Sequence, residues 1–573
     1  MSQSSMVKRR SLIKGLAATS LLPLLGGNLV GCSDGSDNNF DRIVAAFLHG
    51  VASGDPLSDR VILWTRVTPA SEGRIRVIWE IASDMAFTNV ITSGSGITTS
   101  EVDYTVKVDA EGLSAGTQYY YRFRTGDTVS PMGRTRTLPV GSITAASFAV
   151  VSCSNYPAGY FHIYREVANS EVDAVLHLGD YLYEYDENGY ATGLAEAIGR
   201  VVEPANELIS LQDYRTRYGQ YRGDTDLQAA HAAHPFLVIW DDHEVANDSW
   251  RDGAQNHNPD TEGDYQERKL AAIQAWYEWQ PVRPPADTNE IIYRRFQYGD
   301  LLDLLMLDTR LIGRDEQFNY AQFSTDGMID VAAARAAFGD SNRTLLGNEQ
   351  LEWLRDNLSQ SSARWQVLGQ QVLMGRYWLP SPIMEALDPS IAGPDAISEG
   401  VTAVFAALDA KAKAPDERTS EEQALLDSAI PYNMDAWDGY EYERDQVLTL
   451  ARDLGSKLVV LAGDTHNAWS TQLTTPDGSV AGVEFGCASV SSPGLEGILG
   501  ETNAGLFGPL ISTLIDDLKD ANLSNRGYLE LTLTPDQLTA VHRFVNTVQD
   551  VEYSVDGALA KEFVISRDDL LLS

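Results

Sequence analysis

The sequence predicts an α/β fold preceded by an all-β sandwich domain. Two patterns of apolar residues support this prediction, and they follow one another along the 573 residues. From residue 47 to residue 140, short apolar runs are separated by Gly, Ser and Pro, which is typical of a β-sandwich. From residue 141 to residue 573, near-continuous apolar runs alternate with stretches of helical periodicity, which is typical of β sheets flanked by helices. The length of the chain also favours more than one domain.

The first region is expected to contain only strands. Within residues 74–81 every second side chain is apolar, so one face of this strand should be buried. Residues 113–119, Leu-Ser-Ala-Gly-Thr-Gln-Tyr, resemble the corner that precedes a late strand in fibronectin type III domains. We therefore expect a fibronectin III-like or immunoglobulin-like sandwich over residues 47–140. The clearest predicted strands are 61–64, 74–81 and 119–123.

The second region alternates between predicted strands and helices. Its strands are apolar almost throughout, as expected when both faces are covered. They are predicted at 148–151, 174–178, 236–240, 301–307, 365–368 and 458–462. Leu351, Leu354 and Leu358 recur at helical spacing between two of these strands. Residues 388–427 are rich in Ala, Glu and Asp and are expected to form an inserted helical excursion, either a lid over the site or surface decoration.

Residues 1–32 have the pattern of an export signal. A twin arginine lies in Lys8-Arg9-Arg10-Ser11, and residues 16–25 supply an apolar stretch too short to span a bilayer. The sequence Leu-Val-Gly before Cys32 resembles a bacterial lipoprotein processing box. We expect export by the twin-arginine route, a lipid anchor on Cys32, a polar linker over residues 33–46, and a periplasmic or cell-surface location.

Composition excludes some classes of function. The chain has 43 Lys and Arg against 81 Asp and Glu, so its formal charge is −38. Nucleic-acid binding through the general surface is not expected, because phosphate contacts need clustered positive charge. Three cysteines cannot build a disulfide framework. After Cys32 is assigned to the lipid anchor, Cys153 and Cys487 remain, and two alternatives stay open: a disulfide between them, or Cys153 as a thiolate ligand of a metal.

Five short blocks carry side chains suited to a metal centre, and each follows an apolar run. Any one block is weak evidence, because Gly-Asp after a strand is commonly a turn. Their combination indicates a shared site, because the carboxyl ends of strands in an open α/β sheet meet at one crevice. The residues concerned are Cys153, Asp180, Tyr183, Asp242, His243, Asp438, Asp464 and His466.

The residue types favour two cations and hydrolytic chemistry. Asp180 can bridge two ions, and Tyr183 lies one helical turn beyond it. Thiolate and phenolate ligands favour ferric iron at one position, whereas an all-oxygen position accepts calcium or manganese. Such a pair would clamp a phosphoryl oxygen and activate water for in-line displacement. Cys153 as a nucleophile is the alternative, although no motif supplies a base for it.

The order of the blocks resembles the PhoD-type alkaline phosphatase and phosphodiesterase family, which is related to purple acid phosphatases within the calcineurin-like metallophosphoesterases. The resemblance extends from Phe-Leu-His-Gly-Val-Ala-Ser-Gly-Asp-Pro at 47–56 and Leu-Trp-Thr-Arg at 63–66, through every block, to Arg-Gly-Tyr at 526–528. It implies a metallophosphatase sandwich over residues 141–573, a fibronectin-like N-terminal domain, and Fe³⁺ with Ca²⁺ as cofactors.

The resemblance also implies roles for individual residues. Iron would be held by Cys153, Asp180, Tyr183 and His466. The second metal would be held by Asp180, Asn247, Asp438 and Asp464, with Asp242 competing with Asn247. His243 would be a general acid or hydrogen-bond donor to phosphate. Arg310, Gln371 and Arg444 would position anionic oxygens, or else form structural ion pairs and core hydrogen bonds. Ser154 departs from the family, which more usually has glutamine there.

The function that the resemblance implies is hydrolysis of phosphate monoesters and diesters, working best at alkaline pH, with small or polymeric phosphate esters as substrates. One alternative is a phosphodiesterase that acts on phospholipid or teichoic-type polymers. An alternative of another class is a surface-anchored binding protein whose phosphatase domain is inactive. A monomer is expected.

Overall fold

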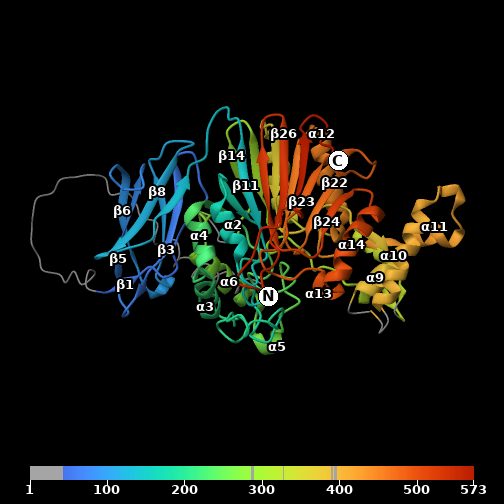
Figure 1. Cartoon of the computed structure of the whole chain (residues 1–573), viewed down its shortest axis with the longest axis horizontal. Helices are drawn as coiled ribbons and strands as arrows, with labels where there is room; N and C mark the ends of the chain where they lie inside the picture. Colours follow the sequence, from blue (N-terminus) through green and yellow to red (C-terminus); the bar gives the residue numbers. More distant parts are fainter. Residues whose placement is uncertain (1–42, 286–289, 327, 389–391, 393–395, 573) are drawn as a thin grey trace, which may run out of the picture.

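The computed structural model describes residues 43–572, apart from 286–289, 327, 389–391 and 393–395 (Figure 1). The predicted export signal, Cys32 and most of the predicted linker lie outside the described residues. Among the helices that are described, none is both long enough and apolar enough to cross a bilayer.

Two large mixed sheets form the body of the molecule. The first has nine strands in the order β27-β26-β25-β11-β12-β13-β2-β3-β7. In that order they are Lys561–Ser566, Gln537–Phe544, Gly527–Leu533, Ala146–Val151, Ala174–His177, Pro235–Val238, Val51–Gly54, Arg60–Arg66 and Thr105–Glu111. The second has seven strands in the order β14-β15-β18-β21-β23-β22-β24. These are Arg294–Tyr298, Leu302–Met306, Trp365–Gly369, Leu458–Ala462, Val480–Gly486, Ala468–Thr474 and Leu518–Asn522.

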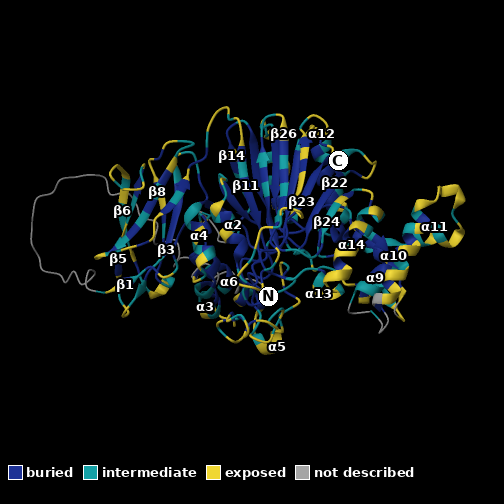
Figure 2. Cartoon of the chain, viewed as in Figure 1, coloured by how far each residue is buried: buried dark blue, intermediate teal, exposed yellow. Residues whose placement is uncertain are grey.

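The two sheets share one apolar core. Leu302, Leu304 and Met306 of β15 pack in the same cluster as the strands of the nine-stranded sheet. Leu305 belongs to a second cluster, together with Leu354 of a covering helix. Successive residues of a strand point to opposite faces, so β15 is buried on both sides. Figure 2 shows the strands of both sheets largely buried, with exposed residues concentrated on helices and loops.

Helices and small sheets complete the structure. The helices are α2 His162–Asn169, α3 Leu211–Arg222, α4 Thr225–Ala233, α5 Pro259–Glu262, α6 Tyr265–Trp279, α7 Val331–Phe338, α8 Gly347–Gln360, α9 Ser381–Leu387, α10 Ala396–Ala412, α11 Ser420–Asp427, α12 Glu441–Leu454, α13 Glu496–Leu499 and α14 Glu501–Leu514. Two-stranded sheets pair β1 Ala45–Ala46 with β4 Thr68–Pro69, β16 Ser324–Thr325 with β17 Met328–Ile329, and β19 Trp378–Pro380 with β20 Ala429–Pro431.

The N-terminal region is rich in strands, as predicted, and is joined to the body through a sheet. Its own five-stranded sheet contains β5 Ile75–Ala82, β6 Val90–Thr98, β8 Gln118–Thr125, β9 Thr128–Val129 and β10 Gly133–Arg136. Three further strands of this region, β2, β3 and β7, extend the nine-stranded sheet, because β2 pairs in parallel with β13. Gly54 makes this junction possible, since a Cβ atom there would overlap the carbonyl oxygens of Phe236 and Pro281.

The strands and helices predicted for the second region are confirmed. All six predicted strands are present, as β11, β12, β13, β15, β18 and β21, and the leucine repeat lies in α8. The strands β11, β12 and β13 are parallel neighbours, as are β15, β18 and β21. The loops that follow these strands therefore leave the two sheets at corresponding edges.

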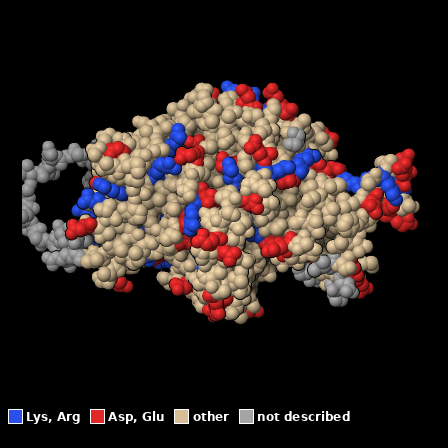
Figure 3. Space-filling model, in the orientation of Figure 1, with Lys and Arg blue, Asp and Glu red and all other residues tan. Residues whose placement is uncertain are grey.

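The excursion predicted at 388–427 is helical where it is described. In Figure 1, α10 and α11 extend toward one end of the long axis of the molecule, and α10 packs against α9 and α14. This placement favours surface decoration over a lid. On the face shown in Figure 3, Lys and Arg occur in small separate groups among Asp and Glu.

Candidate metal centre

The loops after three strands hold their key residues in an unusual backbone conformation. Cys153 after β11, Asp180 after β12, and both Asp464 and His466 after β21 have φ angles of 61°, 54°, 64° and 62°. A positive φ is uncommon for residues other than glycine and persists where the surroundings impose it. All four are residues that the sequence assigned to the metal centre, so the backbone strain coincides with the predicted ligands.

The first predicted ligand set comes together in space. The ligand atoms of Cys153, Asp180 and His466 all lie within 4.8 Å of one another. The phenol oxygen of Tyr183 is 3.0 Å from Asp180 Oδ2 and 3.0 Å from His466 Nε2. Thiol, carboxylate, phenol and imidazole groups from three separate loops thus converge on one point.

The orientation of His466 suits a ligand. Its Nδ1 lies 2.7 Å from the carbonyl oxygen of Pro493, so Nδ1 carries the proton and donates it to this carbonyl. Nε2, on the side of Asp180 and Tyr183, is then the atom with a free lone pair. A backbone carbonyl therefore selects the tautomer that a metal needs.

Burial keeps two of these groups protonated when no cation is present. Burial raises the pKa of Cys153 well above its ordinary value, and the charge of Asp180 adds to the effect. Burial likewise raises the pKa of Tyr183, again with a contribution from Asp180. A thiolate and a phenolate at these positions would therefore depend on a bound cation, whose binding releases the two protons.

A second group of carboxylates lies beside the first. Asp241, Asp242 and Asp464 form one group of carboxylate oxygens within 4.8 Å of one another, and Asp180, Asp242 and His243 form a second group of two carboxylate oxygens and an imidazole nitrogen. Among the described residues, Asp180 Oδ1, Asp241 Oδ2 and Asp242 Oδ1 are buried carboxylate oxygens with no hydrogen-bond partner. Buried carboxylate oxygens are normally paired or bound to a metal, so this donor set fits a cation.

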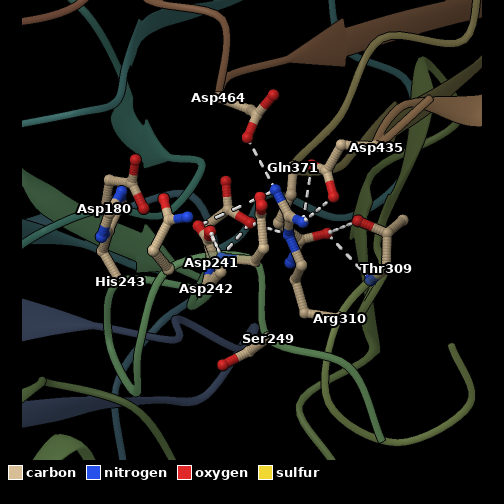
Figure 4. A network of polar contacts seen from close by, with 12 residues as sticks. Asp180, Asp241, Asp242, His243, Ser249, Thr309, Arg310, Gln371, Asp435 and Asp464 are labelled. Atoms are coloured by element: carbon tan, nitrogen blue, oxygen red, sulfur yellow. Dashed lines mark hydrogen bonds and ion pairs between the residues drawn. The ribbon is translucent and has the colours of Figure 1, made fainter. Parts of the chain in front are cut away.

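Arg310 is the positive charge at the centre of these carboxylates (Figure 4). It is completely buried and contacts Asp241, Asp464 at 2.6 Å and Asp435 at 2.8 Å. Burial raises the pKa of Asp241 and of Asp464, and Arg310 opposes this rise. Burial also acts to raise the pKa of Asp242, but Arg310 and His243 outweigh it and bring that pKa to about 2. Arg310 therefore balances buried negative charge and holds the carboxylates in place.

Two acidic residues of this cluster were not predicted. Asp241 is the first aspartate of Trp-Asp-Asp-His-Glu, and Asp435 lies three residues before Asp438. Both are bonded to Arg310, and Asp435 also pairs with Arg314. Both residues lie in or near a block that was identified from the sequence. The sequence alone does not show which of several neighbouring aspartates contacts Arg310.

Asp438 and Arg444 are bonded to each other instead of facing this cluster. Arg444 Nη1 lies 2.7 Å from Asp438 Oδ1, and the backbone N–H of Tyr377 donates to Asp438 Oδ2 at 2.8 Å. Gln371 is also fully engaged, since it accepts from Thr309 and donates to the carbonyl of Trp240 at 2.6 Å. Their geometry matches the structural ion pair and core hydrogen bonds that were the alternative interpretation.

His243 is held by a buried carboxylate. Its Nδ1 lies 2.7 Å from Glu184 Oε2, and its ring centre is 4.2 Å from that of Tyr183. Burial lowers the pKa of His243, but Asp242 and Glu184 outweigh burial and hold that pKa well above its ordinary value. Glu184 also accepts from the backbone N–H of Asn247 at 2.7 Å. The side-chain amide of Asn247 donates to Gln255 Oε1 at 3.1 Å.

Glu244 fastens two of the loops together. Its carboxylate accepts the backbone N–H groups of Asp180 at 3.0 Å, Tyr181 at 2.5 Å and Asp241 at 2.6 Å. A carboxylate that accepts several backbone N–H groups fixes the loops that carry them. The last residue of Trp-Asp-Asp-His-Glu thus positions the turn that carries Asp180.

The two described cysteines are free thiols. Cys153 and Cys487 are buried and not bonded to each other, so the disulfide alternative is wrong. Ser152 lies between them, with its Oγ 3.2 Å from each sulfur. Cys153 therefore keeps its sulfur available as a ligand.

This fold and this site define a phosphoric ester hydrolase, and the chain belongs to the PhoD-like phosphatase family. The family model for PhoD-like phosphatases matches residues 148–542, and the model for their N-terminal domain matches residues 34–139. The resemblance drawn from the sequence is thereby confirmed. Members of this family depend on metals for activity, in agreement with the clustered ligands described above.

Individual relatives support the same assignment. The chain is 33% identical to alkaline phosphatase D of Bacillus subtilis (strain 168) over 543 residues, which cover 91% of this chain and 81% of the relative. A solved structure described as the structure of PhoD has a TM-score of 0.73 and 32% identity, and the match covers 94% of this chain and 93% of that one.

Proposed function

We propose that this chain is an exported metal-dependent phosphatase that hydrolyses phosphate monoesters and diesters with two different cations. The observation that carries the proposal is the convergence of Cys153, Asp180, Tyr183 and His466. A soft thiolate beside a phenolate, a carboxylate and an imidazole is the donor set expected for Fe³⁺. The oxygen-only set of Asp241, Asp242 and Asp464 is the one expected for Ca²⁺, and Asp180 lies beside Asp242.

The proposed cations would supply Lewis acidity, by polarising a phosphoryl oxygen and lowering the pKa of water. The protein's own residues do the rest. His243, fixed through Nδ1 by Glu184, presents its Nε2 proton toward the centre and donates it to a phosphate or leaving-group oxygen. Arg310 lies in hydrogen-bond contact with Asp464, so it orients that carboxylate and does not approach the substrate directly.

Substrate preference and location are part of the same proposal. In-line displacement needs only a phosphoryl centre and a leaving oxygen, so both monoesters and diesters fit the chemistry. The twin arginine and Cys32 support export and a lipid anchor at a periplasmic or cell-surface membrane. A Cys32→Ser variant should leave the membrane fraction while retaining its phosphatase activity.

The test is metal analysis combined with side-by-side assays of an aryl monoester, an aryl diester and a phospholipid. We expect iron and calcium in the active protein, and a visible charge-transfer band that shifts in Tyr183→Phe and is lost with the iron in Cys153→Ala. Cys487→Ala is the matched control, because it removes the other buried thiol and should retain iron. Active protein without iron, or equal iron loss in both cysteine variants, would contradict the proposed first metal.

A further inference from the structure

We infer that Ser152 and Cys487 form a hydrogen-bond relay to the sulfur of Cys153 and thereby tune this sulfur as a metal ligand. The inference rests on the proposed function, in which Cys153 binds the first metal. It assigns a role to Cys487 and to Ser152, neither of which the sequence placed in the site.

The relay is compact and completely enclosed. Ser152 Oγ lies 3.2 Å from Cys153 Sγ and 3.2 Å from Cys487 Sγ. All three residues have no exposed surface. Water therefore does not compete for these contacts, and each polar group has the others as its partners.

Three strand ends hold the relay in place. The backbone N–H of Val490 donates to the carbonyl of Ser152 at 2.9 Å, and that of Cys487 donates to Ala462 at 2.9 Å. A Cβ atom on Gly463 would lie 2.9 Å from Ser152 Cβ and 3.0 Å from its Oγ. Glycine at position 463 is therefore what lets Ser152 lie against the strand that leads to Asp464.

Only one arrangement of protons satisfies the relay once Cys153 is a thiolate. A thiolate accepts hydrogen bonds and donates none, so the hydroxyl of Ser152 donates to Cys153. The oxygen of Ser152 is then free to accept, and Cys487, which is an S–H group when buried in apolar surroundings, donates to it. The order is Cys487 to Ser152 to Cys153.

Such a relay changes the electronic character of the sulfur. A hydrogen bond to a metal-bound thiolate withdraws electron density from it, and hydrogen bonds to ligand sulfur are a recognised control of the potential of metal sites. Loss of the bond should raise the donor strength of the thiolate. The sulfur-to-metal transition then moves to longer wavelength, and the reduction potential of a bound ferric ion falls.

The chain supplies a matched control on the other side of the same cysteine. Ser154 is also completely buried, but its Oγ lies 2.6 Å from the phenol oxygen of Tyr164. That phenol in turn lies 2.8 Å from His177 Nε2. Ser152→Ala and Ser154→Ala thus remove the same hydroxyl from equally buried serines, and only the first contacts sulfur.

The experiment uses the full chain loaded with Co²⁺, whose thiolate charge-transfer band reports on sulfur and not on the phenol. We expect Ser152→Ala to shift this band to longer wavelength, Cys487→Ala to shift it less in the same direction, and Ser154→Ala to leave it in place. Iron-loaded Ser152→Ala should also have a lower midpoint potential than the wild type. The relay is refuted if the Ser152→Ala band coincides with that of the wild type, or if Ser154→Ala shifts the band equally.

Two further variants separate the relay from the proposed metal site. Cys153→Ala should abolish the band, and a band that persists would overturn the metal site itself. Cys487→Ser keeps a donor at that position, so its band should lie closer to that of the wild type than the Cys487→Ala band does. Because Cys487→Ala and Cys487→Ser alter a residue that does not touch the metal ligands, they test the relay even where Ser152→Ala fails to fold.

Discussion

Glu184 Oε2 lies 2.7 Å from His243 Nδ1, and this buried pair fixes the imidazole beside the ring of Tyr183. Glu184 has no exposed surface, and it also accepts a hydrogen bond from Asn256 Nδ2 at 2.8 Å. A carboxylate with this many donors stays ionised and holds the histidine in one orientation. His243 can therefore present only Nε2 to a phosphate ester.

Replacing Glu184 with Gln should lower kcat by about 10-fold to 100-fold, less than the roughly 100-fold to 10,000-fold that a general acid contributes, because His243 itself remains. Glu184 raises the pKa of His243, so its removal lowers that pKa. Imidazolium is lost as pH rises through its pKa, and the alkaline fall in kcat should move to lower pH. A pH profile of kcat measures this shift. Glu207→Gln, which removes a carboxylate paired with Arg268, should leave the profile unchanged.

Arg310→Ala should destabilise the protein strongly, because it leaves Asp241, Asp435 and Asp464 without their shared partner. Removing one member of a buried ion pair costs about 3 to 5 kcal/mol. Urea unfolding of chelator-treated protein measures this loss of unfolding free energy. The chelator is needed because bound cations should partly offset the loss. Arg452 is partly exposed and pairs with Asp453 and Asp477, so it supplies the control, and Arg452→Ala should not change the unfolding midpoint measurably.

Asp435→Asn and Asp438→Asn distinguish two neighbouring candidates for the second metal. Asp435 contacts Arg310 at the carboxylate cluster, so Asp435→Asn should weaken calcium binding. Asp438 is paired with Arg444, so Asp438→Asn should lower stability and leave calcium affinity nearly intact. Calorimetric titration with Ca²⁺ and urea unfolding measure the two effects. The opposite pattern would restore Asp438 as a ligand, as the sequence predicted.

Stability should fall as pH rises from about 4.5 to about 7 because of Glu484. Burial raises its pKa from 4.5 to about 7, although the N–H groups of Met374 and Gly375 oppose the rise. The folded state therefore binds a proton that the unfolded state has released, and stability is lost as pH approaches the folded pKa. A shift of this size corresponds to about 3 kcal/mol. Urea unfolding at several pH values measures the free energy of unfolding across this range. Its dependence on pH should be weaker in Glu484→Gln and unchanged in Glu421→Gln, which alters an exposed residue of α11.

Gly54→Ala should weaken the junction between β2 and β13. The new methyl group would overlap two carbonyl oxygens, and overpacking of this kind typically costs about 1 to 3 kcal/mol. Gly193→Ala is the control, because a Cβ atom there has no neighbour within 4 Å. Thermal unfolding should show a clear decrease for the first variant only. Equal melting temperatures would mean that the N-terminal strands are joined less tightly than their pairing indicates.

Local patterns were enough to predict much of the fold. Alternation in residues 74–81 identified β5, and the leucine spacing identified α8, because strand and helix periodicities are set by backbone geometry. The ends of β11, β12 and β21 were also predictable. Cys153 and Asp180 follow β11 and β12, which are parallel neighbours, so their carboxyl ends share one edge of a sheet. Asp464 follows β21 of the other sheet, so its place in the centre depends on how the two sheets pack.

The sequence by itself determined the main strands of the second region, the family and the candidate residues of the first ligand set. Only the tertiary structure decided which of the nearby aspartates face the centre. Asp435 and Asp438 are three residues apart, but their side chains have different partners. Arg310 binds Asp435, and Arg444 binds Asp438. Arg444 lies only six residues beyond Asp438, but Arg310 lies 125 residues from Asp435, so the contact of Asp435 depends on long-range packing. The same holds for Cys487, which reaches Ser152 across 335 residues.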